Sequence, residues 1–172
     1  MSRRLPNLVA RWSAGWIRER RRTLGPGARP LSAVEKDAMT GYFEPALLDD
    51  VRIASVPRIE GPWFVRPLEA FGLSLDVAFE GAAGITFGDL IVISSLAPGT
   101  SVPSALLFHE LVHVVQYRVQ GIDGFARAYV HGWWDNERSY RAIPHEVEAY
   151  TYESLFRRGE QFFVTCGLPE PP

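Results

Sequence analysis

The chain has 172 residues and a mass of 19.3 kDa, which suits one domain with a real hydrophobic core. Its 47% hydrophobic and 22% charged residues exclude a wholly disordered or collagen-like chain. The single cysteine excludes an intramolecular disulfide and a cysteine-rich zinc site. No apolar run reaches the roughly 18 residues that a membrane span needs.

The net charge of −2 hides two regions of opposite charge. Residues 1–30 carry eight arginines and one acid, whereas the rest of the chain carries ten basic and nineteen acidic residues. We therefore divide the chain into a basic N-terminal arm (1–30), a main domain (31–165) and a proline-rich tail (166–172).

The arm has the pattern of an amphipathic helix that ends at 25–27. Arginines occupy the polar faces, and the apolar residues recur every three or four positions: Leu5, Leu8, Val9, Trp12 and Trp16. Three interpretations stay open. The helix packs on the main domain, it binds an anionic membrane surface or a protein partner, or it contacts nucleic-acid phosphates. No recognition motif accompanies the arginines, so we expect no specific nucleic acid as partner.

The expected location follows from the absence of a leader pattern and from codon bias. No apolar run followed by a small-residue cleavage site marks a secretory signal. Arginine supplies 17 of the 18 basic residues, a bias typical of GC-rich bacterial genomes. We expect a cytoplasmic bacterial protein, with secretion by a route that needs no signal peptide left open.

The main domain shows strand patterns first and helix patterns afterwards. A capping box at Ser32 and Glu35 predicts a helix to Met39, and one helical turn is expected at 47–50. Strands are predicted at 51–55, 73–79, 84–87 and 90–94, the last two joined by a tight turn at 88–89. Helices are predicted at 104–120, capped by Gly121, and at 144–159. This order indicates an α+β fold with a small mixed or antiparallel sheet.

The first long helix carries an HExxH motif, His109-Glu110-Leu111-Val112-His113. Positions i and i+4 share a helix face, so the two imidazoles can bind one zinc ion, with Glu110 beside them to act on water. The neighbouring positions are apolar nearly all round, which predicts a buried helix. Buried imidazoles are costly unless they are paired or metal-bound, and the alternative is a pair of ordinary core histidines.

Zinc needs a third protein ligand. The extended metzincin motif is absent, because Gln116 and Val119 stand where glycine and histidine are required. The candidates that remain are Asp123, His131, Asp135, His145, Glu146 and Glu148.

We favour Glu146, which lies in the first turn of the next helix. It shares one helix face with Ala149, Tyr150 and Glu153, and the small Ala149 allows a close approach to the HExxH helix. The alternative is that Glu146 only complements the helix dipole, a role that Glu148 fits better because it points to another side.

These motifs resemble a known family. HELVHVVQY followed by a Pro-x-Glu-x-x-Ala helix is similar to the gluzincin side of the zincin-like metallopeptidases. More narrowly, residues 40–155 resemble the metallopeptidase-like domain of unknown function in cargo of extracellular contractile injection systems. The segments 42–43, 51–53 and 84–88 add to this resemblance.

The resemblance implies that residues 31–165 form a zincin-like domain with one Zn²⁺ ion. By carry-over, His109, His113 and Glu146 are the ligands and Glu110 is the general base. One position departs from the pattern. Gluzincins often have Asp four residues after the ligand Glu, hydrogen-bonded to a ligand His, and this chain has Tyr150 there.

The implied activity is hydrolysis of peptide bonds in a peptide or protein substrate. Candidates for the donor that stabilises the oxyanion, or for a partner of a ligand, are His131, Tyr140, His145 and Tyr150. The strand at 90–94 is expected to be the sheet edge along which the peptide lies, and the arm to lie over the cleft. The alternatives are a zinc-binding interaction module or delivered effector domain without catalysis, and an adaptor that acts through the arm.

Overall fold

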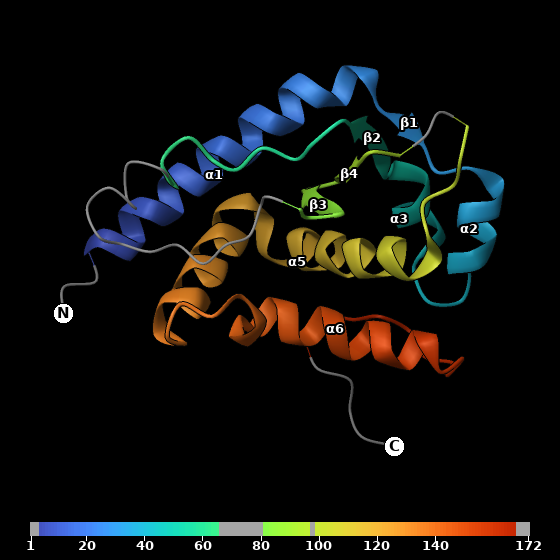
Figure 1. The fold of residues 1–172 in the computed structure, drawn as a ribbon. Coiled ribbons are helices and arrows are strands. Elements are labelled where there is room, and N and C mark those ends of the chain that lie inside the picture. Colours follow the sequence, from blue (N-terminus) through green and yellow to red (C-terminus); the bar gives the residue numbers. More distant parts are fainter. Residues whose placement is uncertain (1–3, 66–80, 97–98, 168–172) are drawn as a thin grey trace.

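The computed structural model describes residues 4–65, 81–96 and 99–167 (Figure 1). A long helix comes first, a four-stranded sheet with two short helices follows, and two further helices complete the described chain. The predicted α+β class with a small mixed sheet is confirmed. The strand predicted at 73–79 and the end of the predicted tail lie outside the described residues.

The N-terminal helix α1 (Arg4–Leu24) packs on the rest of the chain, as the first of the three interpretations of the arm expects. Its apolar face is buried at Val9, Trp16 and Ile17. A 3₁₀ turn at Gly25–Gly27 ends it and leads into the sheet. In Figure 1, α1 runs across the top of the molecule and α6 lies at the bottom.

Two short helices join the first strands. β1 (Arg29–Pro30) leads into α2 (Ala33–Met39), whose N-terminus has the predicted capping box at Ser32 and Glu35. α3 (Pro45–Asp50) is longer than the predicted turn, because a proline suits the first helical position.

The sheet has the strand order β1-β2-β4-β3. β2 (Arg52–Val56) is parallel to β4 (Leu90–Ser94), and β4 is antiparallel to β3 (Gly84–Phe87) across the predicted turn. The expectation that 90–94 forms the sheet edge is therefore wrong. β4 pairs on both sides, and within the described residues β3 is the edge strand next to it.

The two faces of the sheet support two apolar clusters, because side chains alternate along a strand. Ile53, Ile91 and Ile93 pack against the first part of α5 and against α6. Leu90 and Val92 point the other way and pack with α1 and the last part of α5. The sheet therefore separates α1 from the buried start of α5.

The long helix α5 (Ser104–Asp135) contains the predicted break at Gly121, where φ is 67°. The first helical segment ends at Gly121 as predicted, and the chain turns there into a second helical segment that the sequence did not predict. A 3₁₀ turn (Tyr140–Ala142) then leads to α6 (Pro144–Arg157), which ends two residues before the predicted Gly159. α5 and α6 pack closely, and a Cβ at Gly132 would stand 2.7 Å from the ring of Pro144.

In the part of the chain that the structure describes, no helix combines the length and the apolar composition needed to span a bilayer.

Candidate metal site

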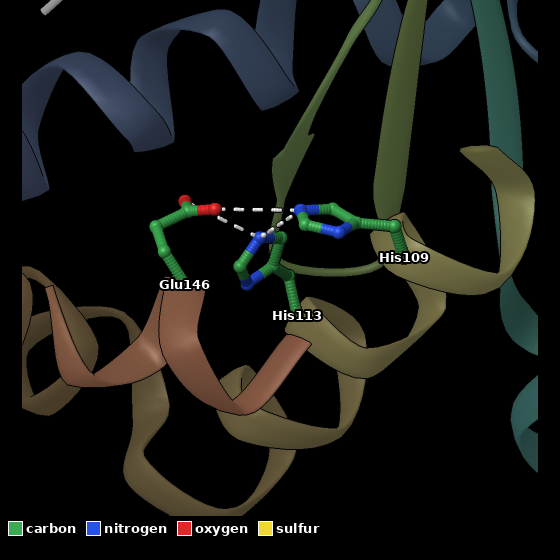
Figure 2. A group of neighbouring side chains, drawn as sticks. All are labelled: His109, His113 and Glu146. Carbon is green, nitrogen blue, oxygen red and sulfur yellow. Dashed lines mark hydrogen bonds and ion pairs between the residues drawn. The ribbon is translucent and has the colours of Figure 1, made fainter. Parts of the chain in front are cut away.

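Two helices bring three potential ligands together. His109 and His113 lie one turn apart on α5, and Glu146 faces them from the first turn of α6 (Figure 2). The two Nε2 atoms are 3.2 Å apart. The Glu146 oxygens lie 3.4 Å from Nε2 of His109 and 3.5 Å from Nε2 of His113. All three side chains are buried.

These distances suit ligands that surround one ion. Tetrahedral zinc with bonds of about 2.0–2.1 Å holds neighbouring ligand atoms roughly 3.3–3.4 Å apart. Oε2 of Glu146 is buried and has no hydrogen-bond partner among the described residues, an expensive state for a carboxylate oxygen without a cation. Three residues of this chain could therefore hold a metal ion.

The far side of each ligand has its own partner, which fixes its orientation. Nδ1 of His109 is 3.1 Å from Oε2 of Glu153, and Nδ1 of His113 is 2.8 Å from Oε1 of Gln116. The Tyr129 hydroxyl donates to Oε1 of Glu146 at 2.7 Å. With Nδ1 protonated on both rings, the Nε2 lone pairs are directed toward the shared centre.

Glu153, rather than residue 150, places a carboxylate behind His109. It lies two helical turns after Glu146, and therefore on the same face of α6. The sequence placed Glu153 on this face but assigned it no role. Tyr150 is adjacent, with its ring centre 4.6 Å from that of His109.

Gln116 extends the network away from the site. Its Nε2 donates to the carbonyl of His145 and to Oε2 of Glu148, and Oε1 of Glu148 accepts from the backbone N–H of Gly167. The predicted dipole role of Glu148 is thus incomplete, because this carboxylate has two specific donors. In the sequence, Gln116 was notable only because it stands where metzincins have glycine.

Glu110 is buried beside the three ligands and faces β3. Thr86 Oγ1 donates to its Oε2 at 2.7 Å, a contact that the sequence did not predict. A Cβ at Gly84 would stand 2.6 Å from Oε1, so the close approach of strand and carboxylate requires glycine. Burial raises the pKa of Glu110, and the nearby imidazoles of His113 and His109 oppose this shift.

Without a metal ion the three ligands form a charged cluster. Burial lowers the pKa of His109, but the nearby carboxylates of Glu146 and Glu153 outweigh this effect and raise the pKa to about 10. Burial opposes ionisation of Glu146 as well, yet the charge of His113 holds its pKa well below the ordinary value. A metal ion must therefore displace protons from the imidazoles when it binds.

Of the four residues predicted to stabilise the oxyanion or to support a ligand, two line the cavity of the metal site and two do not. Tyr140 and Tyr150 line the cavity of the metal site. Burial and the Glu146 carboxylate raise the pKa of Tyr140, so its phenol keeps its proton and can donate it in a hydrogen bond. His131 and His145 do not belong to the cavity lining. Their Nε2 atoms lie 2.8 Å from Asn7 and 3.0 Å from Gln120, respectively.

Two other residues that were candidates for the third ligand also lie away from the metal site. Asp123 is paired with Arg18 of α1, and Asp135 is exposed at the end of α5.

The cavity has a volume of about 800 Å³ and adjoins His109, Glu110, His113 and Glu146. Residues of α1, the loop at 62–65, β3, both segments of α5 and α6 line it. Within the described residues, the potential metal ligands therefore lie at a cavity large enough for a ligand of several residues.

A family model described as the eCIS core domain matches residues 76–121. The matched segment contains β3, β4, His109, Glu110 and His113, whereas Glu146 lies outside it. Searches of curated proteins and of solved structures gave no match.

Proposed function

We propose that the chain is a zinc-dependent metallopeptidase. The observation that carries the proposal is the convergence of the Glu146 carboxylate and two imidazole nitrogens, with N···N and N···O distances of 3.2–3.5 Å and Glu110 buried beside them. A purely structural zinc site has four protein ligands and no use for a neighbouring base. Three ligands, a base and an adjoining cavity are typical of a hydrolytic site.

Several residues at the site have distinct roles in the proposed peptide hydrolysis. Bound zinc supplies Lewis acidity to a substrate carbonyl and lowers the pKa of water. Thr86 holds Oε2 of Glu110, so the carboxylate keeps one orientation while it takes a proton from the attacking water and returns it to the leaving amine. The phenols of Tyr140 and Tyr150 line the cavity and are candidates to donate to the developing oxyanion.

The edge strand β3 suggests how a peptide substrate lies. Ala83 accepts a hydrogen bond from the Ser94 N–H, so alternation along the antiparallel pair directs the backbone groups of Gly84 and Thr86 away from β4. These two residues contact Glu110. An extended peptide paired with them would place its backbone beside the general base.

The eCIS core match supports a place for this peptidase among cargo of extracellular contractile injection systems. In that setting the chain is a delivered effector or processing domain, and it needs no signal peptide of its own. Its substrate is then a protein or peptide met on delivery or within the system.

Elemental mass spectrometry on the untagged protein tests the metal site. We expect about one zinc per chain in the wild type, with loss of zinc in His113→Ala and Glu146→Ala. His131→Ala is the matched control, because this imidazole lies outside the cavity lining and should leave the zinc content unchanged. A wild-type protein that takes up no zinc after incubation and dialysis refutes the proposal.

A peptide-library digest then tests catalysis. Glu110→Gln keeps all three ligands and the shape of the base, so it should retain zinc while hydrolysis falls by about 10²–10⁴-fold. Zinc binding without any cleavage by the wild type favours the interaction module instead.

A further inference from the structure

Two chemically different groups of residues line the cavity at the metal site. The potential ligands and Glu110 are polar. The other group is apolar and comes from α1 and from the second segment of α5: Val9, Trp16, Ile17, Phe125, Val130 and Trp133. Each apolar residue is at most 8% exposed, so these side chains form packed walls rather than loose surface groups.

α1 forms a wall that continues into the edge strand. The Trp16 ring meets Phe87 of β3 edge to face, with ring centres 5.0 Å apart. β3 also carries the Gly84 and Thr86 contacts with Glu110. The wall of α1 and the general base are therefore connected through one short strand.

Ion pairs fix α1 to both elements that complete this wall. Nε and Nη2 of Arg21 each donate to the Asp89 carboxylate at 2.6 Å, at the turn between β3 and β4. Arg18 pairs with Asp123, two residues after the break in α5. Two arginines of the basic arm therefore pair with aspartates of the main domain and stabilise the position of α1 beside the cavity.

The size and chemistry of the cavity indicate what fills it. Its volume of about 800 Å³ far exceeds the space that a glycine or alanine side chain would occupy, so a small side chain would leave most of the space beside the apolar walls unfilled. A large apolar side chain suits both the volume of the cavity and the chemistry of these walls.

We propose that α1 is part of the substrate-binding site, and that the substrate is a peptide with a large apolar side chain next to the bond at the metal site. That side chain lies between α1 and the second segment of α5. This inference rests on the proposed peptidase function and adds its substrate class. It also makes the N-terminal helix, which lies outside the matched segment 76–121, a determinant of specificity.

Binding of peptide hydroxamates to the zinc-loaded full chain tests the inference by calorimetry. Three probes differ only in one side chain, which is leucine, alanine or aspartate. We expect leucine to bind at least 10-fold more tightly than alanine, because one methylene in an apolar pocket is worth about 10-fold or more, and aspartate to bind most weakly.

Ser13→Trp places a large ring on the cavity-lining face of α1, whereas Arg11→Trp places the same ring on the exposed face. The leucine preference should fall below 3-fold in Ser13→Trp, with the alanine probe and zinc content unchanged, and should persist in Arg11→Trp. If Ser13→Trp does not fold, Ile17→Ala serves instead. It removes atoms from the wall, enlarges the cavity and should shift the preference from leucine to a phenylalanine probe.

Each outcome separates this inference from the proposed function. Zinc binding with equal affinity for leucine and alanine probes overturns the specificity assignment and leaves the metal site standing. An equal loss of all three probes in Ser13→Trp and Arg11→Trp overturns the role of the α1 wall. Absence of zinc from the wild-type protein overturns both proposals together.

Discussion

Replacing Glu153 tests whether the metal site depends on a carboxylate behind His109. Glu153 Oε2 is 3.1 Å from Nδ1 of His109, and the two side chains are only 13% and 8% exposed. Glutamine keeps an acceptor for the Nδ1–H but removes the charge, and alanine removes both. If Glu153 orients His109 and raises its basicity as inferred, both variants weaken metal binding without touching a ligand.

The magnitude follows from the strength of the contact. A hydrogen bond to a charged group is worth about 1.5–3 kcal/mol and a neutral one about 1 kcal/mol. Arg157 shares the Glu153 carboxylate but is 62% exposed, so solvent screens its influence. We expect zinc affinity to fall about 10-fold in Glu153→Gln and about 100-fold in Glu153→Ala, within the range known for partners of metal ligands.

Competition with a chromophoric chelator measures both dissociation constants. Glu160→Gln is the matched control, because Glu160 pairs with Arg158 and has no contact with the site. An affinity that is unchanged in both Glu153 variants would show that His109 needs no carboxylate, and would refute this account of the missing aspartate at position 150.

Three further outcomes are expected. Zinc binding at pH 8 should release at least one proton, because the pKa of His109 without metal is about 10, and affinity should fall as pH is lowered; calorimetry in buffers of different ionisation enthalpy counts the protons. Gly84→Ala should lower peptide hydrolysis about 100-fold with zinc retained, since its Cβ would stand 2.6 Å from Glu110, whereas Gly15→Ala on the exposed face of α1 should change neither. Burial raises the pKa of Glu35, but hydrogen bonds from Arg29, from the Val102 N–H and from Ser32 outweigh it and lower the pKa from 4.5 to about 2. Glu35→Gln should therefore lower the free energy of unfolding by about 2 kcal/mol at pH 7, since solvent at the partly exposed Arg29 screens part of the effect. The contribution is present above pH 4.5 and disappears as pH falls toward 2, so in denaturant titrations the variant should lose less stability than the wild type over that range.

Local patterns predicted most of the described elements. The capping box at Ser32 and Glu35, the tight turn at 88–89 and the apolar run around the HExxH motif each depend on neighbouring residues. The same proximity made His109, Glu110 and His113 recognisable, because a spacing of four residues defines one helix face. The break at Gly121 was also predicted, although the helix that follows it was not.

Local sequence patterns could not predict the contacts between segments that are far apart in the chain. Thr86 is 24 residues from Glu110, and Tyr129 approaches Glu146 from the second segment of α5. Neither residue type is distinctive in the sequence. The position of β4 in the middle of the sheet was missed for the same reason, since its parallel pairing with β2 joins strands far apart in the chain.

Residue spacing and capping motifs were enough to identify the potential metal ligands and the starts of the helices that carry them, because helix periodicity and capping act over a few residues. Three results required the folded chain: Glu146 is the carboxylate that meets the two histidines, Glu153 lies behind His109, and the basic arm forms a cavity wall. Those results depend on how α1, β3, α5 and α6 pack, and packing is set by apolar burial summed over the whole chain.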